Sequence, residues 1–308
     1  MRWFESPTFD FIKAHNIAYF VSGTLIIGSL IAIFGMGLNY GIDFRGGKEF
    51  VIELQEPVDV VQVRSVLTQP LGTAPEVKRF GSPRDLLIRT DAEGDISEVQ
   101  STIVNTFNEE FPGNTPTVVK TDIVGPRFAE DLKIGALNSI IFAVAVVFIY
   151  ILIRFKGWYF SAGAVAALVH DVVIVLGIFT VMGEIAPFDV TIDQALIAAF
   201  LTIVGYSLND TVVVFDRIRE NSIIYKTMNF TDMINKSLND TLSRTIITSV
   251  TTLFVVSVLF IFGGEVLKGF SFALVIGVIL GTYSSLFVAS ALVVELEKRA
   301  MKMKSKVK

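Results

Sequence analysis

Six long apolar stretches limit what this 308-residue chain can fold into. A helix of about 17–25 predominantly apolar residues can cross the hydrocarbon core of a bilayer. The chain is 52% hydrophobic and only 18% charged, with a mean hydropathy of +0.61. We therefore predict a membrane protein with a six-transmembrane α-helical bundle. The predicted spans lie within 17–38, 134–153, 158–182, 192–220, 246–262 and 269–294.

The composition changes between the first two spans. Residues 39–132 are charged and strand-prone, and they contain no stretch that could cross a membrane. Alternating apolar residues predict four strands, and helical spacing predicts two helices between them. The order β-α-β-β-α-β is that of the ferredoxin-like motif, so we predict an inserted α+β domain with one small core. The predicted strands lie in 47–56, 74–82, 84–91 and 115–125, and the helices in 58–69 and 95–111.

The remaining segments complete a division into five parts. Residues 1–16, with aromatic residues such as Trp3 and Phe11 among charges, predict a segment at the membrane surface and no cleavable signal peptide. Residues 17–38 form the first span, and 133–294 hold spans two to six. Residues 295–308 form a basic tail. A polar loop is predicted after Phe215, up to Arg244.

The charges of the loops predict the orientation. Lysine and arginine accumulate on one side of the predicted bundle, at 154–156, at 217–236 and in the tail. The opposite turns carry mainly acids, with Lys268 as the only lysine. Because basic loops stay in the cytoplasm, both termini should be cytoplasmic and residues 39–132 should lie outside.

An ionisable residue lies within the fourth span, at Asn209-Asp210. A carboxylate at the centre of a bilayer costs about 2.5–3.5 kcal/mol on insertion scales, and such residues are usually functional. At 1.5 Å per residue, Asp210 lies about 10 Å deeper than Arg217, which should mark the cytoplasmic end of this span. Arg244 should lie about 12 Å deeper than Lys236, so Asp210 and Arg244 are predicted at a similar depth.

Several alternatives remain open for the polar residues of the spans. Asp210 and Arg244 could form a static ion pair, or Arg244 could extend to the membrane surface. His170-Asp171 in the third span could carry protons or could be a hydrogen-bonded polar spot. We expect Gly23, Gly28 and Ser29 in the first span, and Gly277-xxx-Gly281 in the last, to allow close packing of helices. The acids Asp189 and Asp193 should be solvated ends of a turn.

Several function classes are disfavoured by the sequence. Protease- and hydrolase-type motifs are missing, so we expect no enzyme and no cofactor. The two histidines, His15 and His170, make a histidine metal site improbable. The net charge of -4 gives no reason to expect nucleic acid as a partner, and the absence of cysteine rules out disulfides.

Several stretches of the sequence resemble the SecF family of bacterial protein-export subunits. The resemblance covers nearly the whole chain, and the motif of the fourth span together with the distant SRT element is the most specific part. The stretches are NYGIDFRGG from residue 39, HDVVIVLG from 170, GYSLNDTVVVFDRIREN from 205, LSRTIITSVTTL from 242, and FGGEVLKGFSFALVIGVILGTYSS from 262.

The resemblance implies a multi-pass protein of the bacterial cytoplasmic membrane, in the resistance–nodulation–division superfamily. It implies a SecD-like partner subunit and help for polypeptide leaving the SecYEG channel, driven by the proton gradient. The family's intramembrane Asp and Arg match Asp210 and Arg244. Asn209, His170 and Asp171 are further candidates for a proton relay.

Three hypotheses for function follow. The first is a proton-coupled export subunit, in which Asp210 pairs with Arg244 or takes a proton when the two separate. The second is a passive membrane scaffold that holds a SecD-like partner and a polypeptide-binding domain without proton coupling. The third, a half-transporter for small molecules, ranks last because the inserted domain needs its apolar residues for its own core.

Overall fold

A computed structural model describes residues 9–155, 157–183, 185–186 and 188–306. Within this part of the chain, six helices are long and apolar enough to cross a membrane. The chain is therefore a multi-pass membrane protein. These helices are α1 (His15–Met36), α5 (Pro126–Phe155), α6 (Trp158–Met182), α7 (Gln194–Ile224), α8 (Phe230–Phe262) and α9 (Glu265–Ser284), the last continued by a π-helical turn η1 (Ser285–Ala289) and α10 (Ser290–Lys306).

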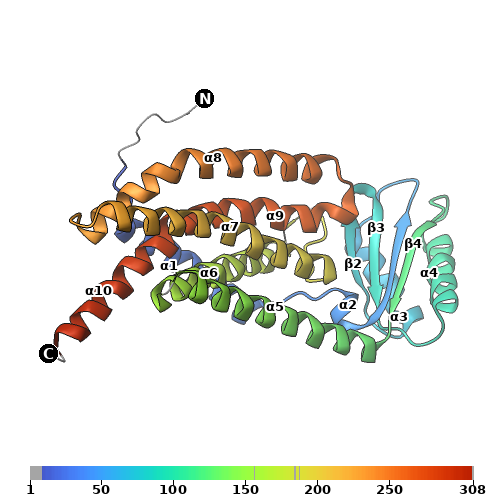
Figure 1. The fold of residues 1–308 in the computed structure, drawn as a ribbon. Coiled ribbons are helices and arrows are strands. Elements are labelled where there is room, and N and C mark those ends of the chain that lie inside the picture. Colours follow the sequence, from blue (N-terminus) through green and yellow to red (C-terminus); the bar gives the residue numbers. More distant parts are fainter. Residues whose placement is uncertain (1–8, 156, 184, 187, 307–308) are drawn as a thin grey trace.

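A sheet domain follows α1 and lies at one end of the helix bundle, while α10 lies at the other end (Figure 1). Its four strands are all paired antiparallel, in the order β2-β3-β1-β4. In chain order its elements are α2 (Ile42–Arg45), β1 (Gly47–Glu53), α3 (Val60–Leu71), β2 (Glu76–Phe80), β3 (Ser82–Thr90), α4 (Ile96–Glu110) and β4 (Thr117–Val124).

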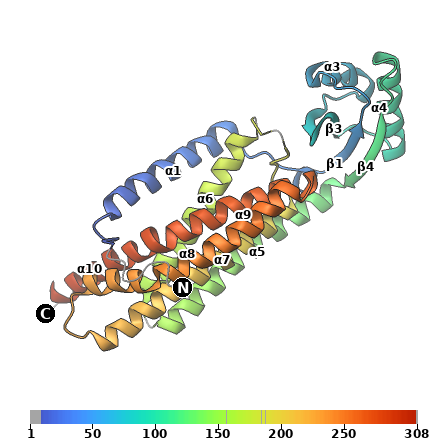
Figure 2. The same ribbon diagram turned by 90° about the horizontal axis from the view of Figure 1, so that it is seen from above.

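The core of the sheet domain lies between the sheet and the helices α3 and α4, which lie on the side away from the bundle (Figure 2). Alternate residues of β1 and β3 point into this core because successive side chains of a strand face opposite sides. Fully buried members are Phe50, Ile52, Leu86, Ile88, Leu67, Ile103 and Phe107. The opposite face carries Glu49 and Arg89, and Arg89 reaches the membrane helices through Asp189.

Two consecutive glycines fix the entry of the chain into the sheet. Gly46 and Gly47 have φ angles of 77° and 121°, which side chains rarely adopt. A Cβ on Gly46 would lie 3.0 Å from Cα of Pro126, and one on Gly47 would lie 3.0 Å from the carbonyl oxygen of Thr90. Both glycines are therefore required where α2, β3 and the start of α5 meet.

The predicted polar loop between Phe215 and Arg244 is wrong. Helix α7 continues to Ile224 and α8 already begins at Phe230, so only residues 225–229 connect the two. Apolar residues within this polar stretch, such as Ile218 and Ile234, are buried in the same core at this end of the bundle. Asn221 also donates a hydrogen bond to Ser237 (2.9 Å), so the two extensions stabilise each other as helices.

The segment before α1 packs against α8. Phe11 and Ile12 are buried in the core at this end of the bundle. The amide of Phe11 donates to the side-chain oxygen of Asn235 (2.8 Å), and that of Phe9 donates to Asn239 (2.9 Å). Trp3, which also suggested a surface segment, lies outside the described residues.

The expected close contacts of small residues are confirmed for the last long helix; in the first they are confirmed for Ser29 and wrong for Gly23 and Gly28. A Cβ on Gly277 would overlap with Ile203, and one on Gly281 would lie 3.0 Å from Cβ of Ser207, so α9 packs closely on α7. Gly23 and Gly28 have no neighbour within 4 Å of such a Cβ. The close contact of α1 is made by Ser29, which lies against Gly177 of α6.

Candidate functional site

Asp210 lies in the middle of α7 and is almost completely buried, with 3% of its surface exposed. The hydroxyl groups of Thr248 and Ser249 on α8 lie beside its carboxyl group. The oxygen Oδ2 has no hydrogen-bond partner among the described residues. A buried carboxylate with a free oxygen is costly, so this group can gain stability from a proton or a cation.

Arg244 lies on α8 and its side chain is exposed. It is close enough to act on the Asp210 carboxyl electrostatically, yet the ion pairs of the described residues do not include these two. The static ion pair is therefore not the arrangement in this structure. Asn209, the neighbour of Asp210, is exposed.

His170 and Asp171 form a second buried polar cluster (3% and 0% exposed). Nδ1 of His170 lies 2.9 Å from Oδ1 of Asp171. The other carboxylate oxygen, Oδ2, accepts hydrogen bonds from Ser207 of α7 (2.9 Å) and Ser284 of α9 (2.7 Å). Both carboxylate oxygens of Asp171 therefore have hydrogen-bond partners, which come from α6, α7 and α9. Oδ2 of Asp210, by contrast, has none among the described residues.

A chain of hydroxyl groups continues from the other side of His170. Its Nε2 lies 3.0 Å from Oγ of Ser22 on α1, which lies 3.0 Å from the phenol oxygen of Tyr283. Tyr283 in turn donates to the carbonyl oxygen of Ala18 (2.9 Å). Hydroxyl groups both donate and accept, so the chain can adjust its bonds to either protonation state of His170.

Helices α7 and α9 connect the two polar clusters. On α7, Ser207 contacts Asp171 and lies about one turn before Asp210. On α9, Ser284 contacts Asp171, while Thr282 donates to Ser249 (2.7 Å), the hydroxyl beside Asp210. A shift of either helix would therefore change the surroundings of both carboxylates.

The serines of this region were missed by sequence reasoning. Ser22, Ser207, Ser249 and Ser284 are buried, and each bonds a side chain of another helix. Serine is common at close helix contacts in membranes, so a single serine gives little signal on its own. The usable signal is spacing, since Ser207 lies three residues before Asp210 on the same helix.

Asp189 and Asp193 are not the solvated turn residues that we expected. Asp189 forms a salt bridge with Arg89 of β3, and its side chain is only 18% exposed. Asp193 caps α7 by accepting a hydrogen bond from the amide of Leu196 (2.7 Å). Burial raises the pKa of Asp193 to about 6, and the nearby acids Asp189 and Asp43 add to this effect.

The acidic residues do not gather into a metal site. No group of three or more His, Asp or Glu residues within the described ranges could hold a metal ion. The site contains carboxyl, imidazole and hydroxyl groups, which can exchange protons, together with the permanently charged guanidinium group of Arg244.

These features define a membrane protein whose bundle encloses ionisable groups at its centre and carries a sheet domain at one end. The family profile described as "Protein export membrane protein SecD/SecF, C-terminal" matches residues 103–299, and that of the "SecD/SecF GG Motif" matches residues 31–58. The chain belongs to the SecD/SecF family of protein-export membrane proteins.

Relatives in this family match nearly the full length of the chain. The protein translocase subunit SecF of Rhodothermus marinus is 58% identical over 300 residues, covering 97% of both chains. That of Calditerrivibrio nitroreducens is 42% identical over 288 residues, covering 92% of both chains. A role in protein export follows from this membership.

Two solved structures share the fold. The crystal structure of SecDF, a translocon-associated membrane protein from Thermus thermophilus, has a TM-score of 0.86 and 33% identity, covering 96% of this chain. SecDF in a super-membrane-facing form has a TM-score of 0.73 and 31% identity, covering 99% of this chain. This chain spans only 40% and 41% of those longer proteins.

Proposed function

We propose that this chain is a SecF-type subunit of the bacterial Sec translocase that uses the proton gradient to assist late translocation and release of polypeptides outside the cytoplasmic membrane. The supporting observation is the free oxygen of Asp210. A carboxylate that is buried without a bonded cation has two ways to lower its energy. It can take a proton, or it can move toward the guanidinium group of Arg244.

These two choices make Asp210 the proton-binding residue of the proposed cycle. When ionised, the carboxylate attracts the guanidinium group of Arg244 from its exposed position toward the interior of the helix bundle. When protonated, it becomes a hydrogen-bond donor, and Arg244 is free to leave. Each proton that crosses the membrane releases about 2.3 kcal/mol per 100 mV of potential. This energy exceeds the cost of breaking a hydrogen bond between helices, about 0.6 kcal/mol on average.

His170 and Asp171 form the fixed part of the proposed relay. Asp171 accepts hydrogen bonds from Ser207 and Ser284, and these bonds hold α6, α7 and α9 in register. His170 joins this carboxylate to the hydroxyl groups of Ser22 and Tyr283. A proton can pass along such a chain by reorientation of the hydroxyl groups.

The sheet domain is proposed to receive the exported polypeptide. Its element order β1-α3-β2-β3-α4-β4 and its strand order β2-β3-β1-β4 support a ferredoxin-like fold. In the part of the chain that the structure describes, β4 pairs with β1 alone, so its outer edge is free. Val119 and Ile123 on β4 are exposed, and an extended polypeptide could add to this edge as a further strand.

We further propose a SecD-like subunit as the direct partner, with the SecYEG channel as the source of the polypeptide. Helix α8 supports this assignment because only 17% of its apolar window is buried. Arg244 is exposed on α8, so a partner that covers this helix would also enclose the charge. Both termini are proposed to be cytoplasmic, because α10 and the basic connection between α7 and α8 lie at the end away from the sheet domain (Figure 1).

The test is the Asp210→Asn variant, reconstituted with a SecD-like subunit and SecYEG in vesicles. We expect the part of polypeptide export that depends on the proton gradient to disappear, while membrane insertion and partner binding remain. The matched control is Asp216→Asn, which changes an acid of the same helix that pairs with Arg154 near the end of α5. Normal gradient-dependent export by Asp210→Asn would instead support the passive scaffold.

A further inference from the structure

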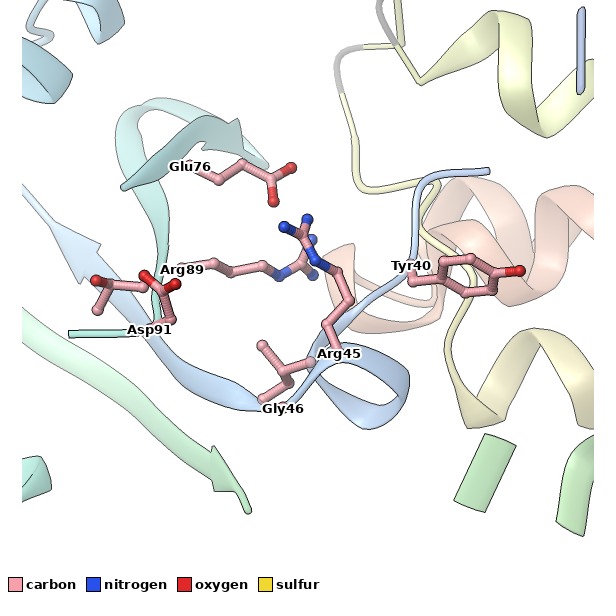
Figure 3. Close-up of a pocket in the computed structure, with 8 residues that line it drawn as sticks. Tyr40, Arg45, Gly46, Glu76, Arg89 and Asp91 are labelled. Atoms are coloured by element: carbon pink, nitrogen blue, oxygen red, sulfur yellow. The ribbon is translucent and has the colours of Figure 1, made fainter. Parts of the chain in front are cut away.

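Two cavities meet at the junction between the sheet domain and the membrane helices. The first is a polar pocket of about 200 Å³. Figure 3 shows the guanidinium groups of Arg45 and Arg89 next to each other in it, with Glu76 directed toward them. The second is a groove of about 730 Å³ between α5, α6 and α7. Tyr40 and Arg45 line both cavities, so one elongated ligand could occupy the two together.

The polar pocket offers hydrogen-bond donors that the protein leaves unused. Arg89 is 91% buried, and its Nε and Nη2 bond to Glu49 and Asp189. Its remaining terminal nitrogen, Nη1, is buried and has no partner among the described residues. Leaving a buried charged donor unpaired is costly. Arg45 is exposed, and no ion pair of the described residues includes it. An anion between these two guanidinium groups would satisfy both.

The groove has the composition of an acyl-chain site. Most of its lining is apolar, and several lining residues belong to α5, whose apolar window is only 11% buried. At its polar end, Nζ of Lys133 lies 4.7 Å from the centre of the Tyr40 ring. The apolar lining includes Phe44, Leu137, Ile140, Val172, Leu176 and Phe200.

We propose that the polar pocket and the groove together bind one phospholipid. Its phosphate lies between Arg45 and Arg89, with Lys133 nearby, and an acyl chain occupies the groove. Basic pockets between membrane helices are known to hold lipid headgroups in this way. A tyrosine at this level is also typical of the membrane–water interface, where headgroups lie.

The acids of the polar pocket define the headgroup. Glu76 and Asp91 line the pocket together with the two arginines. One oxygen of each is already bonded, to Lys78 (2.9 Å) and to Thr73 (2.9 Å). The second oxygen of each can accept a hydrogen bond from an ammonium group. The ligand is therefore phosphatidylethanolamine, whose amine donates hydrogen bonds, whereas the trimethylammonium of phosphatidylcholine cannot.

The proposed lipid site can be tested with the full chain in phosphatidylcholine nanodiscs. These contain a small fraction of phosphatidylethanolamine that carries a photoreactive acyl chain. We expect crosslinks to residues that line the groove, identified by mass spectrometry. Arg45→Gln removes a phosphate ligand, and Ala136→Phe places a ring in the groove. Each should lower labelling of the groove about tenfold. The matched controls, Arg127→Gln and Ser139→Phe, change exposed residues of α5 that do not line either cavity and should leave labelling unchanged.

Competition experiments identify the ligand. Unlabelled phosphatidylethanolamine should prevent labelling at lower concentration than phosphatidylglycerol or additional phosphatidylcholine, and inorganic phosphate should not prevent it. Equal competition by all three lipids, or equal labelling of Arg45→Gln and the unmodified chain, would overturn the proposal in favour of non-specific lipid contact. Displacement by inorganic phosphate alone would overturn it in favour of a free-anion site. Crosslinks lost when a SecD-like subunit is added would identify the groove as a protein interface.

Discussion

Arg89 on β3 forms a salt bridge with Asp189, a residue one hundred positions later in the chain, in the linker that enters α7. The same guanidinium group donates to Glu49 of β1 (2.8 Å). Burial alone would lower the pKa of Arg89, but the two acids raise it above its usual value, so the group remains charged. This buried cluster therefore ties the sheet domain to the helix that carries Asp210.

We expect Arg89→Met to loosen the sheet domain from the bundle. Removing one member of a buried ion pair leaves the others unpaired and costs about 3–5 kcal/mol. The free energy of unfolding, and hydrogen exchange in the linker before α7, would measure this change. Lys120→Met is the control, because Lys120 reaches the same Glu49 (3.3 Å) but is 43% exposed, and such pairs contribute about 0–1 kcal/mol. Equal effects of the two variants would contradict this role of Arg89.

Asp193 should make the stability of the protein depend on pH. Burial, together with the nearby acids Asp189 and Asp43, raises its pKa from 3.8 to about 6. The hydrogen bond from the Leu196 amide and the charge of Arg89 lower the pKa, but their effect is smaller. The folded state therefore binds a proton more tightly than the unfolded state. This contribution is fully present below about pH 4 and is lost as the pH rises toward about 6. At about 1.4 kcal/mol per pKa unit it amounts to at most about 3 kcal/mol, and less because water reaches part of the side chain.

The Asp193→Asn variant isolates this contribution. Asparagine caps a helix as well as aspartate does, so the bond to the Leu196 amide is retained while the titration is removed. Melting temperatures between pH 4 and pH 8 should show a steeper fall toward pH 6 for the unmodified chain than for the variant. Parallel curves would show that Asp193 has an ordinary pKa.

The sequence predicts the apolar helices and the buried acid well for physical reasons. Length and apolar composition determine which segments can cross a bilayer, and both are readable from the sequence. The isolated charge of Asp210 stands out for the same reason. The sheet elements are readable because strands and helices have different apolar periods.

The contacts between distant segments could not be predicted in the same way. Asp189 looks like an ordinary turn acid, because its partner Arg89 lies in another domain. The extensions of α7 and α8 are polar in composition, and they are stabilised by contacts with the rest of the bundle, in which Ile218 and Ile234 are buried in one core. Gly177 has no signal of its own, since its importance comes from Ser29 on another helix.

Gly177→Ala should separate α1 from α6. The added methyl group would overlap with the side chain and backbone of Ser29, and overpacking of this kind costs about 1–3 kcal/mol. Gly23→Ala is the matched control, because nothing lies within 4 Å of its added Cβ. Alanine is also favoured over glycine in a helix by about 1 kcal/mol, so Gly23→Ala should be neutral or stabilising. Crosslinking between α1 and α6, and the free energy of unfolding, would distinguish the two variants. If Gly177→Ala changed neither measurement, the close contact between Gly177 and Ser29 would be refuted.

The two buried aspartates should respond in opposite ways to replacement by asparagine. Asp171→Asn disturbs bonds to His170, Ser207 and Ser284, and at about 0.6–1.7 kcal/mol for each bond it should cost about 2–5 kcal/mol. Asp210→Asn replaces a carboxylate whose Oδ2 is unpaired, so the folded state should lose little and could become more stable. Unfolding of both variants in the same detergent gives the comparison. If Asp210→Asn were the more damaging change, Asp210 would be a structural residue, and its proposed role as the proton-binding group would lose its support.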